Sequence, residues 1–190
     1  MATDASTTKS TNTGRQTRWS ARQLAIMAIF VALGVLLSFL RFPIFPAAPF
    51  LTYEPTTLPS IIGGIAFGPG AGLLIGILSI AIQGLMIGDP IGAVMNLVVV
   101  IGFVTPLAII CRKEKTTPRL LIGLVTGSLI STILVVPANL ITIPLIYGGS
   151  MEDILPMVLP ILLPFNILKA MLNSILGFTL FKSLRKLLER

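Results

Sequence analysis

The chain has 190 residues, of which 54% are hydrophobic and 11% charged, with a formal net charge of +7 and no histidine. Apolar runs of about 18 residues or more exclude an ordinary soluble domain and are long enough to cross a bilayer as helices. With seven acidic residues, no histidine and one cysteine, Cys111, the sequence predicts no metal site, no cofactor, no His-based catalysis and no intrachain disulfide.

Residues 1–18 are polar and rich in Thr and Ser, and we expect them to form a disordered cytoplasmic tail. The apolar run that follows is longer than the core of a secretory signal and lacks a convincing cleavage site. Residues 19–190 are therefore predicted to form one membrane-embedded domain.

The first predicted span runs from about Ser20 to Leu40 and carries a stripe of small residues, Ala21, Ala25, Ala28 and Ala32. Such spacing allows another helix to approach closely, which favours helix association in lipid. The stripe is predicted to contact either a partner subunit or other helices of the same bundle.

A proline- and aromatic-rich loop follows at residues 41–57. Its prolines favour extended, stiff backbone, and its rings, including Phe50 and Tyr53, indicate either an interfacial belt or a lid over a pocket. Because the rings stand beside Glu54, we favour the lid.

Leu58–Met86 would extend about 43 Å as one helix, too long for a single crossing, and it is interrupted at residues 68–70 by Gly-Pro-Gly. We therefore expect two short spans joined by a tight turn, with glycines that permit close packing. Further spans are predicted at 91–111, from about 120 to 146 and from 154 to about 181.

The charge distribution supports an all-α membrane protein of six transmembrane helices with both termini cytoplasmic. In that topology the inner segments hold all Lys and Arg residues except Arg41 and Lys169, and the outer segments hold Glu54, Asp89, Glu152 and Asp153. The basic residues are thus topology signals, and the net positive charge does not predict binding to nucleic acid.

Lys169 is the most informative residue, because it is the only charged side chain between Asp153 and Lys182. A cation at this depth costs roughly 2.5–3.5 kcal/mol on insertion scales, so it needs a partner or a ligand. Asn166 and Asn173 share its helical face, and Pro164 predicts a kink one turn earlier. We interpret this stripe as a solute site rather than a helix contact.

The other conspicuous polar groups within the spans are Gln83, Asn96 and Asn139, which lie in the predicted outer half or near the midplane. With Asn166 and Lys169 they predict a pocket that opens to the outside and suits a flat, polar-edged solute with carbonyl groups. There is no nucleotide-binding motif, so concentrative uptake would require ATPase partners.

The chain resembles the substrate-binding S component of energy-coupling factor (ECF) vitamin transporters, and within them the riboflavin-specific type. The resemblance rests on AIFVA at 28–32, PAAPFLTYEPTTLPSIIGGIAFGPGAG at 46–72, GDPIGAVMN at 88–96 and PFNILK at 164–169. It implies a prokaryotic, multi-pass cell-membrane protein that binds a vitamin from outside and topples in the bilayer to release it. It also implies a membrane scaffold subunit and two cytoplasmic ATPases as partners.

The resemblance also implies residue roles. Asn166 and Lys169 would bind the polar edge of the flavin ring, and Asn139 would add an amide contact. Asn96 matches the family pattern, and Tyr53-Glu54 stands where an aromatic residue followed by Asp is more usual.

Three alternatives remain open at this stage. The same architecture would serve a different vitamin or precursor, and a self-sufficient secondary carrier would transport without partners. An intramembrane enzyme would need a dyad such as Ser174 and Lys169, but five residues of helix place these side chains about 140° apart. We therefore predict a protein that is not an enzyme.

Overall fold

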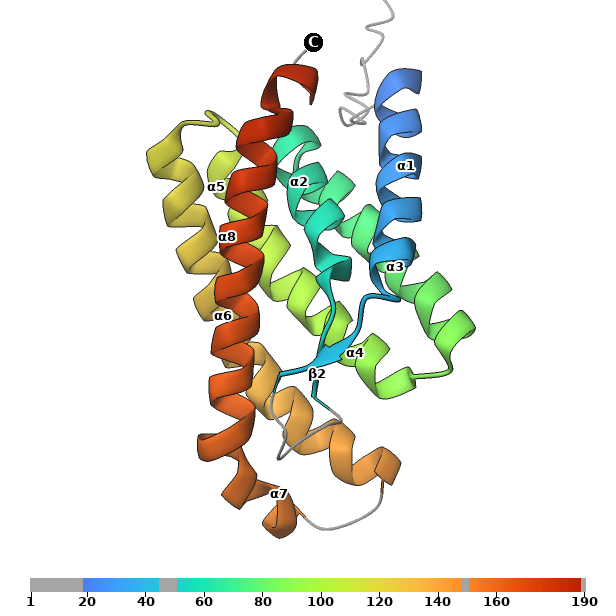
Figure 1. The fold of residues 1–190 in the computed structure, drawn as a ribbon. Helices are drawn as coiled ribbons and strands as arrows, with labels where there is room; N and C mark the ends of the chain where they lie inside the picture. Colours follow the sequence, from blue (N-terminus) through green and yellow to red (C-terminus); the bar gives the residue numbers. More distant parts are fainter. Residues whose placement is uncertain (1–18, 45–50, 148–150, 189–190) are drawn as a thin grey trace, which may run out of the picture.

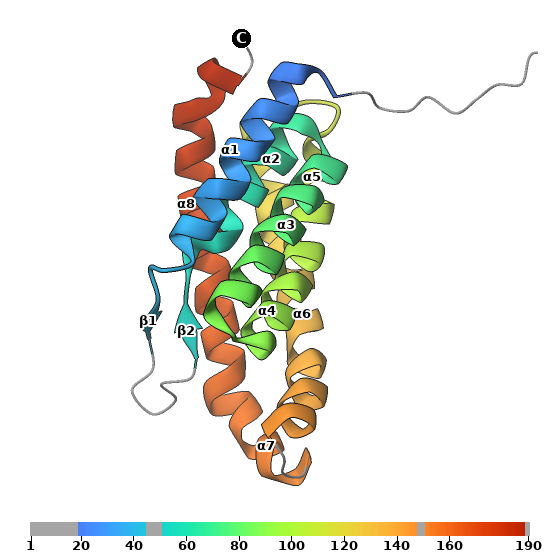
Figure 2. The ribbon, with the colours of Figure 1, turned by 90° about the vertical axis from the view of Figure 1, so that its right-hand side faces the viewer.

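The computed structural model describes residues 19–44, 51–147 and 151–188. The predicted disorder of residues 1–18 and the predicted role of Phe50 fall outside these ranges. The described residues form an elongated helical bundle with a two-stranded hairpin against one side (Figures 1 and 2). The elements in chain order are α1 (Ala21–Leu37), β1 (Phe42–Pro43), β2 (Thr52–Tyr53), the 3₁₀ helix η1 (Pro55–Thr57), α2 (Leu58–Phe67), α3 (Pro69–Ile87), α4 (Pro90–Val99), the π-helix η2 (Val100–Val104), α5 (Thr105–Cys111), α6 (Thr117–Tyr147), α7 (Met151–Met157), the π-helix η3 (Val158–Leu162) and α8 (Leu163–Leu188).

These helices make six passes along the bundle within the described ranges, as predicted, because α4 to α5 and α7 to α8 are each continuous. The stretches that are long and apolar enough to cross a membrane are Pro69–Ile87, Pro90–Cys111, Thr117–Thr142 and Leu155–Lys186, with shorter apolar helices at Ala21–Leu37 and Pro55–Phe67. The start of α1 and the end of α8 lie at the same end of the bundle, where the α5–α6 loop also lies (Figure 1). This is the end to which the sequence assigns the basic segments.

The helix boundaries follow local rules. Ser20 and Gln23 form a capping box at the start of α1. Gly68, with φ of 97°, permits the sharp turn between α2 and α3, and Gly88 ends α3 in the left-handed region with φ of 70°. Asp89 then caps α4, because its Oδ1 accepts a bond of 2.8 Å from the amide of Gly92.

Some boundaries differ from the sequence-based expectation. α1 ends at Leu37 rather than Leu40, where the Ser38 hydroxyl donates to the carbonyl of Val35 at 2.6 Å and closes the helix. The last pass begins at Met151 rather than 154, which places Glu152 in its first turn, a position that the helix dipole favours for an acidic residue. Immediately before α8 and the predicted kink at Pro164, the chain forms the π-helix η3.

The described parts of the proline-rich segment before residue 55 are extended, as predicted, and two of them pair as strands. β1 and β2 are antiparallel, with Phe42 opposite Tyr53 and Pro43 opposite Thr52. The segment then turns into η1, whose first residue is Pro55, a residue tolerated at the start of a helix because its missing N–H would have no helical partner.

The apolar core surrounds α2, in which every residue from Leu58 to Ile65 is buried. The predicted close packing of α2 on α3 is confirmed: a Cβ added to Gly72 would lie 2.7 Å from the Cα of Gly64. It would also lie 2.6 Å from Val104, which shows that the η2–α5 pass packs on the same contact. This part of the bundle leaves no space for larger side chains.

Candidate functional site

A cavity of about 410 Å³ lies between the hairpin, α4, α6 and α8. Its volume falls within the range of small-molecule sites. Its lining residues are Leu51, Thr52, Glu54, Asp89, Ile91, Gly92, Met95, Asn96, Val99, Val135, Asn139, Met157, Phe165, Asn166 and Lys169. The predicted residues Glu54, Asn96, Asn139, Asn166 and Lys169 are thus brought together.

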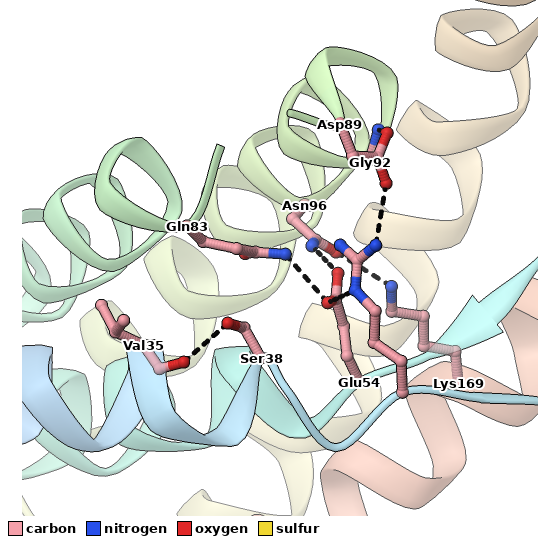
Figure 3. Close-up of polar contacts among 9 residues, drawn as sticks. Val35, Ser38, Glu54, Gln83, Asp89, Gly92, Asn96 and Lys169 are labelled. Atoms are coloured by element: carbon pink, nitrogen blue, oxygen red, sulfur yellow. Dashed lines mark hydrogen bonds and ion pairs between the residues drawn. The ribbon is translucent and has the colours of Figure 1, made fainter. Parts of the chain in front are cut away.

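Glu54 is the centre of the polar network (Figure 3). This glutamate is only 3% exposed. Its Oε2 accepts from Gln83 Nε2 and from Arg41 Nε, each at 2.9 Å, and its Oε1 accepts from Asn96 Nδ2. A buried carboxylate is tolerated when its oxygens are paired and hydrogen-bonded in this way. The network joins the hairpin to α3 and α4.

Lys169 reaches the same network through Asn96. Its Nζ donates to Asn96 Oδ1 at 2.9 Å, and both residues are buried (Figure 3). Within the described ranges, Asn96 is the one hydrogen-bond partner of Lys169. An ammonium has three N–H donors, so two remain for a solute in the cavity.

Asn139 on α6 and Asn166 on α8 form a matched pair in the cavity wall. Each follows a proline by two residues, and each donates its side-chain amide to its own helix: Asn139 to the carbonyl of Val135 at 2.9 Å, and Asn166 to the carbonyl of Leu162 at 2.7 Å. Each amide nitrogen keeps a second N–H, and each side-chain oxygen can accept, so both side chains can accept from and donate to a solute.

Arg41 and Asp89 join the network on its partly exposed side. Arg41 Nη1 lies 3.2 Å from Asp89 Oδ2, and the Arg41 and Asp89 side chains are 23% and 34% exposed. The guanidinium therefore bridges Asp89 and Glu54, two acids on the cavity wall that come from different loops.

Tyr53 and Gln83 do not line the cavity. Tyr53 is buried, and its hydroxyl donates to Asn173 Oδ1 on α8 at 3.1 Å. Gln83 donates to Glu54 and does not itself reach the cavity. Burial raises the pKa of Tyr53 to about 12, so its hydroxyl remains a donor at neutral pH. Both residues support the wall of the cavity.

The sequence patterns predict no site role for Arg41 or Asp89, and they place Asn173 on the polar stripe without a contact of its own. The sequence does contain an indication that Arg41 has a special role, because it is one of the two basic residues outside the predicted inner segments. A cation in an outer segment that carries Glu54 and Asp89 is a candidate for pairing with them.

The cavity presents donors and acceptors side by side between apolar walls. Lys169 donates, Asn139 and Asn166 accept, and side chains such as Met95, Phe165 and Val99 supply flat apolar surface. A planar heteroaromatic ring with carbonyl and N–H groups along one edge would satisfy both sets of groups.

The alanine stripe of α1 lies on the surface of the bundle. Ala25, Ala28 and Ala32 are all exposed, while Met27, Phe30 and Gly34 of the same helix are buried. The stripe therefore does not pack against other helices of the described chain.

Comparison with known proteins identifies the family. The model of the family described as the substrate-specific component of ECF transporters matches residues 22–181. The chain is 27% identical over 176 residues to the riboflavin transporter RibU of Staphylococcus aureus, covering 89% of this chain and 93% of the relative. It is 29% identical over 182 residues to RibU of Streptococcus thermophilus, covering 90% and 86%, and 26% identical over 181 residues to the riboflavin transporter FmnP of Bacillus subtilis, covering 89% and 95%.

The fold agrees with these sequence matches. The chain superposes on a solved S component of a bacterial ECF transporter with a TM-score of 0.78 and 26% identity, covering 89% of this chain and 98% of that one. The resemblance, the six-helix fold and the multi-pass membrane location expected from the sequence are confirmed. The chain belongs to the family of ECF transporter substrate-specific components of the bacterial plasma membrane.

Proposed function

We propose that this chain binds riboflavin from the outer side of the membrane and is the solute-binding subunit of an ATP-driven importer. The observation that carries the proposal is the convergence of Asn139, Asn166 and Lys169 on one cavity of about 410 Å³ with apolar walls. The isoalloxazine ring is flat, with two carbonyls flanking an N–H on one edge, which complements this alternation of donors and acceptors. The names of the three relatives support the same solute.

Partner subunits supply the energy in this proposal. The sequence contains no nucleotide-binding motif, and family membership implies an ECF module as partner. A membrane scaffold subunit contacts the exposed stripe Ala25, Ala28 and Ala32, because small side chains let a second helix approach closely. Two cytoplasmic ATPases act through that scaffold.

We further propose that the chain binds its solute without catalysis. The Ser174 hydroxyl lies 2.9 Å from the Ser128 hydroxyl in the groove between α6 and α8, whereas Lys169 bonds Asn96 at the cavity. Serine and lysine therefore have separate partners and do not form a nucleophile–base pair.

The first test is the visible absorption spectrum of the detergent-purified full chain, before and after addition of riboflavin. We expect flavin bands at one equivalent per chain and riboflavin binding at submicromolar concentration, with no displacement of the bound flavin by equal concentrations of thiamine or biotin. Binding of another vitamin in place of riboflavin would preserve the importer architecture and correct the solute. A protein that ignores riboflavin would contradict the proposal.

The partner contact is tested separately, by uptake of labelled riboflavin into cells or vesicles that contain the complete transporter. Ala28→Leu should leave binding intact and reduce uptake at least tenfold, because the larger side chain holds the scaffold helix away. Val125→Phe is the matched control, since it adds bulk to an exposed position on α6. Parental uptake by Ala28→Leu would show that the stripe faces only lipid.

A further inference from the structure

Arg41 contacts two acids of the cavity wall without lining the cavity itself. Its Nε donates to Glu54 Oε2 at 2.9 Å and its Nη1 to Asp89 Oδ2 at 3.2 Å. Glu54 and Asp89 are among the residues that line the cavity, and Arg41 is not. Arg41 therefore influences a bound solute through these two carboxylates and through the field of its charge, and not by direct contact.

Arg41 also completes the charge balance of the site. Within the described ranges, the ionisable residues that line the cavity are Glu54, Asp89 and Lys169, which carry two negative charges and one positive charge. The guanidinium adds the second positive charge, so the wall and its direct counter-ion sum to zero. Without it, the site would carry a net charge of −1.

The position of Lys169 depends on the same chain of contacts. Glu54 accepts from Asn96 Nδ2, and Asn96 Oδ1 accepts from Lys169. Because a carboxylate only accepts and an ammonium only donates, the amide of Asn96 has one orientation that satisfies both. By holding Glu54, Arg41 helps to fix the donor that faces the solute.

We propose that Arg41 is a positioning residue that keeps the cavity electrically neutral and thereby sets its preference between uncharged and anionic forms of one solute. This inference rests on the proposed riboflavin function. Riboflavin and its 5′-phosphate share the ring, but the phosphate adds about −1.5 to −2 charge at pH 7. That charge stays near water because burying it is costly, and the partly exposed side of the wall is where Asp89 and Arg41 lie.

The test measures the ratio of the dissociation constants for the phosphate and for riboflavin, by flavin fluorescence titration at low salt. Arg41→Gln changes the net charge to −1, Asp89→Asn changes it to +1, and the double variant restores zero. A phosphate group carries about two negative charges, and a wall charge about 10 Å from it in a water-like dielectric changes its affinity about fourfold. Riboflavin is uncharged, so the ratio changes by the same factor for each unit of wall charge. We expect the ratio to rise about fourfold in Arg41→Gln, to fall about fourfold in Asp89→Asn, and to return to the parental value in the double variant.

Arg41→Lys separates charge from geometry. A single ammonium keeps the positive charge but lacks the planar fork that bridges both acids. We expect weaker binding of both flavins in this variant with an unchanged ratio. Arg119→Gln is the matched control, since Arg119 Nε lies 3.3 Å from Glu114 in the α5–α6 loop region, at the other end of the bundle, and its loss should change neither constant.

Each outcome decides the proposal. Equal weakening of both flavins in Arg41→Gln, or an unchanged ratio in Asp89→Asn, would overturn charge selectivity and leave Arg41 with a structural role only. If Arg41→Gln fails to fold, the ratios of Asp89→Asn and Arg41→Lys decide alone. Failure of the parent to bind riboflavin would contradict the proposed function, and it is visible before any ratio is measured.

Discussion

The two ends of the bundle have different roles. Near the α2–α3 turn, Gly64 and Gly72 bring backbones into contact, and Val104 fills the remaining space. Toward the hairpin, the helices separate around a cavity whose wall carries Glu54 and Lys169. The difference shows that close packing and solute binding are concentrated in different parts of the bundle.

This division has an energetic reason. Helices in lipid associate through close van der Waals contact, because lipid tails are as apolar as leucine side chains. A buried network of charges stabilises a fold weakly at best, and breaking it by removal of one partner is costly. Close packing at one end therefore fixes the helices relative to one another. This arrangement places Asn96 between Glu54 and Lys169 at the other end.

The largest effect on the polar end is expected from Lys169→Met, which removes the cation but keeps an unbranched side chain. Two charged hydrogen bonds to a solute at about 1.5 kcal/mol each amount to about a hundredfold in affinity, so we expect riboflavin affinity to fall at least that much. Folding should persist, because the packed end is untouched. Titration of the purified variant measures the loss.

Lys182→Met is the control for that experiment. The same substitution is made on the same helix, at an exposed lysine whose Nζ lies 5.0 Å from the centre of the Phe178 ring. It should leave affinity unchanged. Full affinity in Lys169→Met would remove this residue from the site.

The packed end is tested by Gly72→Ala. The added Cβ would lie 2.7 Å from the Cα of Gly64, and backbone atoms cannot move aside as a side chain can. Overpacking of this kind costs about 1–3 kcal/mol, which should lower the melting temperature by several degrees while the folded fraction keeps its riboflavin affinity.

Gly70→Ala provides the contrast in the same helix. Its Cβ would meet Trp19 at 3.6 Å, an ordinary contact, and alanine is the better helix former. We expect unchanged or slightly higher stability. Equal melting temperatures for the two variants would show that the close approach of α2 and α3 does not limit stability.

Sequence patterns predict the packed end better than the polar end. The Gly-Pro-Gly break and the glycines around it predict two short helices in close contact, because glycine in a membrane helix allows another helix backbone to approach closely. The polar residues Asn96 and Lys169 are also predicted to face a cavity, since exposing them to lipid is costly.

The partners of those polar residues do not follow from the sequence. Which side chain meets Glu54 depends on the rotation of α3 and α4 about their axes, which the whole bundle determines. Asn173 illustrates the problem: it shares a helical face with Lys169, yet it bonds Tyr53 of the hairpin rather than lining the main cavity. Spacing along one helix identifies its polar face, and the contacts across helices decide what each residue does.

The contact between Tyr53 and Asn173 offers the finest test, because it belongs to the polar end but lies outside the main cavity. Tyr53→Phe removes a hydroxyl that donates at 3.1 Å and leaves the buried amide of Asn173 without that partner. An unmatched buried polar group costs about 1–3 kcal/mol, which should lower the melting temperature by several degrees with less than a threefold change in riboflavin affinity.

The double variant Tyr53→Phe with Asn173→Leu completes the cycle. Leucine removes the amide that Tyr53→Phe leaves unpaired, and a void of about 10 Å³ beside Asn173 gives its side chain some room. Replacing both partners by apolar groups is nearly neutral when shape is kept, so the melting temperature should recover toward the parent. No recovery, together with a large loss of affinity in Tyr53→Phe, would mean that this bond positions the solute itself. The residues that determine solute affinity would then include Tyr53 and Asn173, which lie behind the cavity wall.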